Sequence, residues 1–159
     1  MEANTQAKMA VKDILRTLRE QKNLTQEALA EKVLVTRQAV SRWETGETQP
    51  NTETLKLLSR EYGVSINTLL GSPRQLFCQC CGMPLYEDGI VSRESNGDFN
   101  EDYCKWCYAD GKFAYDSLDS LIAFLVPHMS GQLQKTPEET RALLEAQLPR
   151  LKHWQKTSL

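Results

Sequence analysis

Apolar residues follow a helical rhythm through the first seventy positions of the chain. The three- and four-residue spacing of an amphipathic helix is met first by Val11, Ile14, Leu15 and Leu18. Four further short helices are expected over about residues 26–33, 36–44, 52–62 and 65–70. Thr25 and Thr36 are favourable N-caps for two of them, and Gly46 and Gly63 follow two of them as helix-ending residues. This half of the chain is therefore expected to be a set of short, capped helices.

The pattern changes after a glycine, serine and proline cluster at residues 71–73, the best linker candidate in the chain. Residues 77–113 are rich in cysteine, glycine and turn residues, so short strands and tight knuckles are expected there. Helical spacing returns over residues 117–129 and again after the capping-box sequence Thr136–Glu139, which places proline at the first helical position. Pro149 is expected to kink or restart that last helix.

Composition argues against several classes of protein. The chain has 159 residues, of which 40% are hydrophobic and 25% are charged, as in ordinary soluble globular proteins. Its longest apolar run, residues 121–126, is far shorter than the roughly 18 residues that span a bilayer. The N-terminal residues also lack the pattern of a signal peptide, so we expect a cytoplasmic protein with no membrane partner. We do not expect an enzyme, because no Ser/His/Asp set, phosphate loop or open metal site is recognisable.

Charge is distributed unevenly behind a formal net charge of −2. Residues 1–72 carry ten Lys/Arg against nine Asp/Glu, whereas residues 73–159 carry nine against twelve. All five cysteines lie in the second part. Two modules with different roles are therefore expected.

One face of the third expected helix carries long hydrogen-bonding side chains. On a helical wheel, about 140° of arc holds Arg37, Gln38, Ser41 and Arg42. Val40 and Trp43 lie on the opposite side, where they would anchor the helix in a core. Arginine and glutamine can each form two hydrogen bonds with the edge of guanine or adenine, so these four residues are candidates for reading bases. A solvated helix face explains the same spacing, and spacing alone leaves both interpretations open.

Three more polar residues are candidates for contacts with the phosphates of double-stranded DNA. Gln26 begins the second expected helix, where free backbone N–H groups also attract phosphate. Thr36 and Thr45 lie at the two ends of the third helix. Together with the base-reading candidates, they outline an expected interface with DNA.

Two stretches of sequence, Leu24–Ala30 and Val35–Glu44, together with Gly46, carry a family resemblance. They closely resemble the phage-repressor-like (Cro/XRE) helix-turn-helix family, and the resemblance extends over about residues 10–70. It implies a five-helix domain whose third helix enters the major groove, usually as a dimer on a two-fold operator. It also implies an ion pair between Arg19 and Glu44 that fixes the recognition helix.

The sequence departs from this family at two positions. Leu34 stands in the turn where the family usually has glycine, and a left-handed leucine costs on the order of 1 kcal/mol. Glu47 stands where family members often place a lysine for phosphate contact. With so little net positive charge in this half, we expect a shallower salt dependence than that of a strongly basic DNA-binding domain.

Cysteine spacing gives the clearest chemical signal in the chain. Two C-x2-C pairs, Cys78 with Cys81 and Cys104 with Cys107, are separated by 22 residues. The two-residue spacing lets each pair clasp one ion while backbone N–H groups bond the sulfur atoms. Four thiolates favour tetrahedral Zn2+ in a closed structural site, with a rubredoxin-like iron site as an alternative.

The fifth cysteine, Cys80, is expected to be a spare thiol packed in the knuckle. A redox-responsive thiol is the alternative interpretation. His128 and His153 have no ligand spacing to the cysteines and are expected to be surface or packing residues.

The sequence around the cysteines carries a second resemblance, through the segments Cys78–Leu85, Tyr103–Phe113 and Leu148–Trp154. These segments are similar to a zinc-ribbon family of bacteria, and the resemblance covers about residues 77–155. It implies a bound metal and a fold that includes the helices after the ribbon. A ribbon of about forty residues buries too little apolar surface to fold alone, and roughly 10–16 kcal/mol from zinc binding can supply the deficit.

Together these observations predict a mainly α-helical protein of several parts. They are a five-helix repressor-like helix-turn-helix domain over 1–71, a linker over 72–76, a zinc ribbon with four cysteine ligands over 77–116 and two helices over 117–159. The last two helices are expected to pack on the ribbon, with a dimer interface as the alternative.

The function expected first is that of a sequence-specific DNA-binding transcriptional regulator, acting as a homodimer. Its zinc module would serve dimerisation, binding of a protein partner, or sensing. Two other classes remain open: an antitoxin-like or adaptor protein whose C-terminal helices grip a partner, and a metal or thiol-redox sensor.

Overall fold

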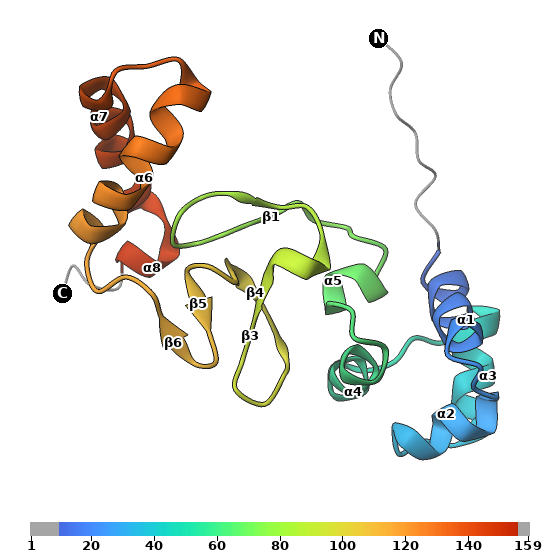
Figure 1. Ribbon diagram of the computed structural model, residues 1–159. Coiled ribbons are helices and arrows are strands. Elements are labelled where there is room, and N and C mark those ends of the chain that lie inside the picture. The colour runs from blue at the N-terminus through green and yellow to red at the C-terminus, as the bar shows by residue number, and fades with distance from the viewer. Residues whose placement is uncertain (1–9, 156–159) are drawn as a thin grey trace, which may run out of the picture. The chain divides into compact units, whose positions relative to one another are not determined.

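The computed structural model of the chain describes residues 10–155, and helices predominate in it (Figure 1). The chain divides into two compact units. Within the described residues, the first comprises residues 10–75 and 97–99, and the second comprises residues 76–96 and 100–155. None of the helices in the described range combines the length and the apolar character needed to cross a membrane.

The first unit is built from α1 (Val11–Gln21), α2 (Gln26–Lys32), α3 (Arg37–Thr45), α4 (Thr52–Tyr62) and α5 (Ile66–Leu69). The expected caps are in place, because the Thr25 and Thr36 side chains accept hydrogen bonds from the backbone N–H groups of Ala28 and Ala39. Gly46 ends α3 in the left-handed conformation, with φ of 85°. The five helices predicted from the apolar spacing are therefore confirmed, with ends that differ by a residue or so.

The apolar faces of these helices meet in one core. Val40 and Leu58 are 0% exposed, and Trp43 is 6% exposed. Helix α3 packs against both α1 and α2. The side of α3 that carries Val40 and Trp43 is thus held in the core, as the helical wheel predicts, and its opposite side is left to solvent.

The second unit begins with a ribbon of short strands that pair as three two-stranded sheets. The strands are β1 (Leu76–Phe77), β2 (Pro84–Leu85), β3 (Val91–Arg93), β4 (Phe99–Cys104), β5 (Tyr108–Ala109) and β6 (Lys112–Phe113), and a 3-10 turn, η1 (Asp88–Ile90), precedes β3. The first and last pairs are antiparallel, with Leu76 opposite Leu85 and Tyr108 opposite Phe113. The expectation of short strands and knuckles in this region is confirmed.

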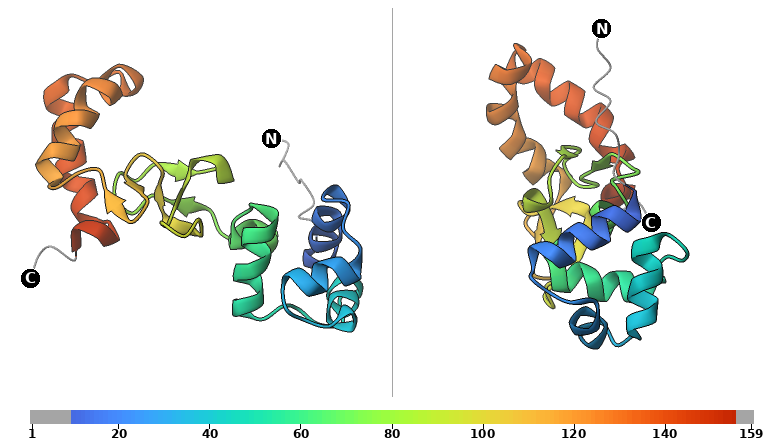
Figure 2. Two further views of the ribbon diagram at one scale, coloured as in Figure 1. Left: turned by 60° about the horizontal axis from the view of Figure 1, so that its bottom comes forward. Right: turned by 90° about the vertical axis from the view of Figure 1, so that its right-hand side faces the viewer.

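Helices follow the ribbon, in the order α6 (Leu118–Leu133), α7 (Pro137–Gln147), η2 (Leu148–Arg150) and α8 (Lys152–Gln155). Helices α6 and α7 pack side by side as a hairpin (Figure 2). The predicted capping box is present: the Thr136 N–H donates to Glu139 Oε2 at 2.9 Å, and the Glu139 N–H donates to Thr136 Oγ1 at 3.1 Å. Pro149 interrupts the helix within η2, and α8 restarts it, as predicted.

Helix α6 is longer than its sequence predicts. The spacing of apolar residues ends near Met129, but the helix continues to Leu133. The Ser130 hydroxyl donates to the carbonyl four residues earlier at 2.6 Å and lies 3.1 Å from the Thr140 hydroxyl of α7. Thr140 is fully buried. The polar contact with α7 therefore supports the last turn of α6, and no apolar periodicity reveals it.

Candidate metal centre and nucleic-acid interface

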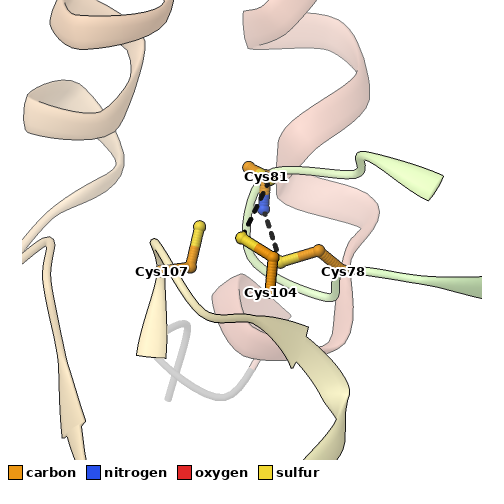
Figure 3. A group of neighbouring side chains, drawn as sticks. All are labelled: Cys78, Cys81, Cys104 and Cys107. Carbon is orange, nitrogen blue, oxygen red and sulfur yellow. Dashed lines mark hydrogen bonds between the residues drawn. The ribbon is translucent and has the colours of Figure 1, made fainter. Parts of the chain in front are cut away.

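Four cysteine side chains converge from two loops of the ribbon (Figure 3). Their sulfur atoms all lie within 4.8 Å of one another, and the Sγ atoms of Cys81 and Cys104 are 3.9 Å apart. Metal–sulfur bonds of about 2.3 Å in a tetrahedral site place the sulfur atoms about 3.8 Å apart. The structure thus brings together the four predicted ligands, and both their chemistry and their spacing fit one metal ion.

Burial and hydrogen bonding set the electrostatics of this cluster. Cys78, Cys104 and Cys107 are at most 2% exposed, and Cys81 is partly exposed. Hydrogen bonds from the neighbouring thiols, first from Cys104, lower the pKa of Cys78, whereas the hydrogen bond with Cys104 raises the pKa of Cys107. The pKa values of the four sulfurs are thus shifted in opposite directions, and burial disfavours charge on each of them, so four thiolates at this spacing call for a cation among them.

The fifth cysteine, Cys80, is not one of the four converging sulfurs, although its thiol shares a hydrogen bond with Cys107. Cys80 is 1% exposed, and its carbonyl accepts a hydrogen bond from the indole N–H of Trp154 at 2.8 Å. The group of four contains Cys81 and excludes Cys80. The geometry therefore agrees with the choice of Cys81 made from the two-residue spacing.

The C-terminal segment is fastened to the first knuckle through Gln79. The backbone N–H of Lys152 donates to Gln79 Oε1 at 3.2 Å, and the backbone N–H of His153 donates to the Gln79 carbonyl at 3.1 Å. Lys152 Nζ also pairs with the Asp102 carboxylate at 2.6 Å. The segment after the ribbon therefore helps to hold the knuckle. Sequence reasoning missed the role of Gln79, since no spacing pattern marks it.

The two histidines are packing residues, as expected. The His153 ring lies 4.1 Å from the Phe113 ring, and the His128 ring stacks on Phe124 at 4.3 Å. Within the described residues, neither belongs to a group of possible metal ligands.

The four base-reading candidates on α3 form the surface that we call the α3 face: Arg37, Gln38, Ser41 and Arg42. Three of them are exposed and Ser41 is half-buried. The structure therefore leaves the α3 face open, directly opposite the buried Val40 and Trp43.

A buried ion pair holds the C-terminal end of α3 against α1. Arg19 donates from Nε and Nη2 to the two carboxylate oxygens of Glu44, at 2.6 and 3.0 Å. The two side chains are only 12% and 5% exposed. Burial by itself raises the pKa of Glu44, but the hydrogen bonds donated by Arg19 and Gln26 outweigh it, and the pKa is lowered. The ion pair that the family resemblance implied is thus confirmed.

The three candidates for phosphate contacts differ in whether they have a hydrogen-bond donor available. Gln26 Nε2 donates to Glu44 Oε2 at 3.0 Å, which leaves its second amide N–H for another acceptor. The Thr36 oxygen accepts the helix-capping bond, so its O–H can still donate outward. The Thr45 hydroxyl donates to the Arg42 carbonyl at 3.1 Å, so it must rotate before it can donate to a phosphate.

The turn before α3 keeps the left-handed backbone that usually calls for glycine. Leu34 has φ of 60°, and its side chain is 84% exposed. The leucine therefore adds strain without adding buried apolar contact.

Both units match known families. Residues 15–69 match the family described as "Helix-turn-helix", and residues 77–155 match the family described as "Putative zinc ribbon domain". Over 62 residues the chain is 48% identical to the HTH-type transcriptional activator BcrR of Enterococcus faecalis. That match covers 39% of this chain and 30% of the relative, so most of the relative's length has no counterpart here.

Two solved structures of the P22 c2 repressor are also similar to part of the chain. One is the crystal structure of the repressor in complex with synthetic operator 9T in the presence of Tl+, at 35% identity over 39% of this chain and 94% of that chain, with a TM-score of 0.38. The other is the nuclear magnetic resonance structure of its DNA-binding domain in solution, at 33% identity over 42% of this chain and 87% of that chain, with a TM-score of 0.39.

Proposed function

Because residues 15–69 form a helix-turn-helix domain of the Cro/XRE type and residues 77–155 form a zinc ribbon domain, we propose that the protein is a sequence-specific DNA-binding transcriptional regulator. The observation that carries this proposal is the α3 face. Its side chains are open to a ligand on one side of a helix whose other side is buried in the core.

The α3 face has the chemistry for reading bases in the major groove. Arg37 and Arg42 present guanidinium groups suited to guanine, and Gln38 presents an amide suited to adenine. The ion pair of Arg19 with Glu44 fixes the angle of α3, because it joins α3 to α1 through two hydrogen bonds in a nearly dry setting. Reading therefore uses a rigid helix whose exposed side chains alone adapt to the bases.

Phosphate contacts would hold the domain in register on the DNA. Gln26 and Thr36 retain donors for this role, and Thr45 gains one on rotation of its hydroxyl. The domain carries almost no net positive charge, so a larger share of its affinity than usual comes from base contacts. We therefore expect DNA affinity to fall less steeply with salt than for a basic domain.

The metal centre is proposed to hold one structural Zn2+ through Cys78, Cys81, Cys104 and Cys107. A closed set of four thiolates leaves no open position for substrate or water, so this zinc would stabilise the ribbon and take no part in a reaction. A colourless protein with one zinc per chain is the expected result of metal analysis. The visible absorbance of an iron–thiolate site would contradict the assignment.

We further propose that the protein acts in the cytoplasm as a homodimer on a two-fold operator. Dimeric helix-turn-helix proteins read two half-sites about one helical turn of DNA apart, which doubles the short sequence that one helix can specify. The zinc ribbon unit is the candidate for dimerisation, because the α6–α7 hairpin leaves Leu133 partly exposed.

Selection of bound sequences from a random DNA pool tests this function. The expected result is a palindromic consensus of two half-sites, which reports base reading and dimerisation together. A single half-site would retain base reading and remove the dimer from the proposal. Recovery of sequences without a consensus would contradict sequence-specific binding.

A further inference from the structure

A cavity of about 560 Å3 lies between the metal centre and helix α6. Three of the predicted metal ligands contribute to its wall: Cys81, Cys104 and Cys107. Side chains with aromatic rings form much of the rest, namely Trp106, Tyr115, Phe124 and His128. The volume falls within the range of about 300–1,000 Å3 that is typical of small-molecule sites.

The rings of this cavity are arranged as a partly open aromatic surface. Tyr115 and Phe124 have ring centroids 5.8 Å apart, and Phe124 stacks on His128 at 4.3 Å. Trp106 and Phe124 are 54% and 48% exposed, so a large part of each ring is open to solvent. Tyr115, Phe124 and His128 thus hold one another in place, while Phe124 and Trp106 keep exposed ring surface.

The described lining of the cavity has no side chain of fixed charge, and its titratable members besides the cysteines are Tyr115 and His128. Among the described residues that line the cavity there is no lysine, arginine, aspartate or glutamate. Four thiolates around one divalent ion carry a formal charge of −2, so the metal centre sets the local potential. Lys105 lies outside the lining but places its Nζ 4.9 Å from the centre of the Trp106 ring. That contact is itself an example of a cation attracted to an aromatic face.

A second cavity beside the first lacks these features. It has a volume of about 540 Å3 and shares Cys81, Met83 and two other residues with the first. Its described lining includes only one of the cysteines and no aromatic ring, and leucines such as Leu144 and Leu148 form much of its wall. Only the first cavity combines an anionic centre with aromatic faces.

We propose that the first cavity binds a hydrophobic organic cation. The positive charge would face the metal–thiolate centre, and the apolar groups would lie against Trp106, Tyr115 and Phe124. Aromatic faces attract cations through their quadrupole, so the rings and the thiolates favour the same sign of charge. An anion of the same shape is repelled by both. The site belongs wholly to the zinc ribbon unit, so it stands independently of DNA binding.

Tetraphenylphosphonium and tetraphenylborate test the proposal, because they share one shape and carry opposite charges. Each is titrated into the zinc-loaded full-length protein, and the heat of binding is measured. The expected result is saturable binding of one phosphonium per chain, with borate at least about tenfold weaker. Equal binding of the two ions, or no binding of the phosphonium, would overturn the proposal.

Substitutions at one ring then locate the site. Phe124→Leu keeps an apolar side chain but removes the quadrupole, so phosphonium affinity should fall about tenfold. Tyr86→Leu is the matched control, because Tyr86 is 70% exposed and lies outside both cavities, and it should leave the affinity unchanged. Zinc content is measured for each variant to show that the metal centre is intact. Unchanged affinity in Phe124→Leu, or equal losses in both variants, would contradict this location.

Discussion

The first unit closes around a set of buried apolar side chains from five helices, whereas the ribbon of the second unit closes around four sulfur atoms. In the first unit, residues such as Val40 and Leu58 are removed from water completely, and one ion pair fixes the orientation of α3. In the ribbon, most strands have only two or three residues, too few to form a stable sheet in isolation. The first unit is therefore stabilised by an apolar core, and the ribbon depends on its cysteine cluster.

This difference also separates the roles of the two units. An apolar core allows the opposite face of α3 to carry polar side chains that take no part in folding, and those residues are free for recognition. In the ribbon, the four cysteines that could bind a metal are needed to hold the fold together. Two aromatic residues of the ribbon, Trp106 and Phe113, remain partly exposed. We therefore expect changes in the metal centre to act on folding and changes on the α3 face to act on binding.

Removal of the metal should have the largest effect. Zinc binding supplies roughly 10–16 kcal/mol in comparable small domains, and a ribbon of this size buries too little apolar surface to fold without it. A chelator should collapse the amide NMR signals of the ribbon while those of the helix-turn-helix unit stay dispersed. Cys104→Ser should have the same effect without a chelator.

Cys80→Ser is the matched control for that experiment. Cys80 is buried but lies outside the group of four sulfurs, so this variant should still bind one zinc per chain. Loss of zinc from Cys80→Ser, or simultaneous unfolding of both units on chelation, would contradict the separate basis of their stability.

Loss of the buried ion pair should have the next largest effect, and only in the first unit. Glu44→Gln leaves the Arg19 guanidinium without its anion in a nearly dry site and should lower the free energy of unfolding by about 3 kcal/mol. Chemical denaturation, followed by a signal from each unit, measures the change. Arg16→Ala, which breaks an exposed pair with Glu20, should cost well under 1 kcal/mol. Comparable costs in the two variants would remove the special role of Glu44.

The same pair should make the first unit sensitive to acid. The pKa of Glu44 is lowered in the folded state, so its contribution is present above the unfolded value of about 4.3 and is lost as the pH falls through the folded value. Stability should therefore drop below about pH 4, and this part of the drop should be missing in Glu44→Gln. Parallel pH profiles for the two proteins would show that Glu44 is not responsible.

The smallest effect is expected at the turn before α3. Leu34→Gly removes the strain of a left-handed leucine whose side chain is almost fully exposed. The variant should be more stable by up to about 1 kcal/mol, part of which is offset by the greater freedom of glycine in the unfolded chain. Thermal unfolding of the first unit measures it. A loss of stability would indicate that the Leu34 side chain makes a contact in solution that favours folding.

Local rules were sufficient to predict most of the fold. Capping residues such as Thr25 and Thr136 act within three residues of themselves, so the sequence alone marks where those helices begin. The C-x2-C spacing acts over the same short range within each knuckle, whereas the meeting of the two knuckles, 22 residues apart, is a long-range contact. The extra turn of α6 was not predicted, because it depends on the contact of Ser130 with Thr140 across a hairpin.

The features of the candidate sites that the sequence did not predict all depend on contacts between residues far apart in the chain. Gln26 was assigned to phosphate, yet one of its N–H groups donates to Glu44, 18 residues away. The fastening of Lys152 to Gln79 joins residues 73 positions apart. The cavity beside the metal centre combines residues of the ribbon with residues of α6. Periodicity and spacing contain no information on such pairs.

Base reading by the α3 face is tested by the substitution Arg37→Ala. Affinity is measured for the DNA sequence selected by the wild-type protein and for random DNA, at one fixed salt concentration. Loss of the Arg37 contact should weaken binding to the selected sequence by about 1–3 kcal/mol and relax specificity at one base pair, while binding to random DNA changes little. Equal losses on the selected and random sequences would contradict base reading by the α3 face.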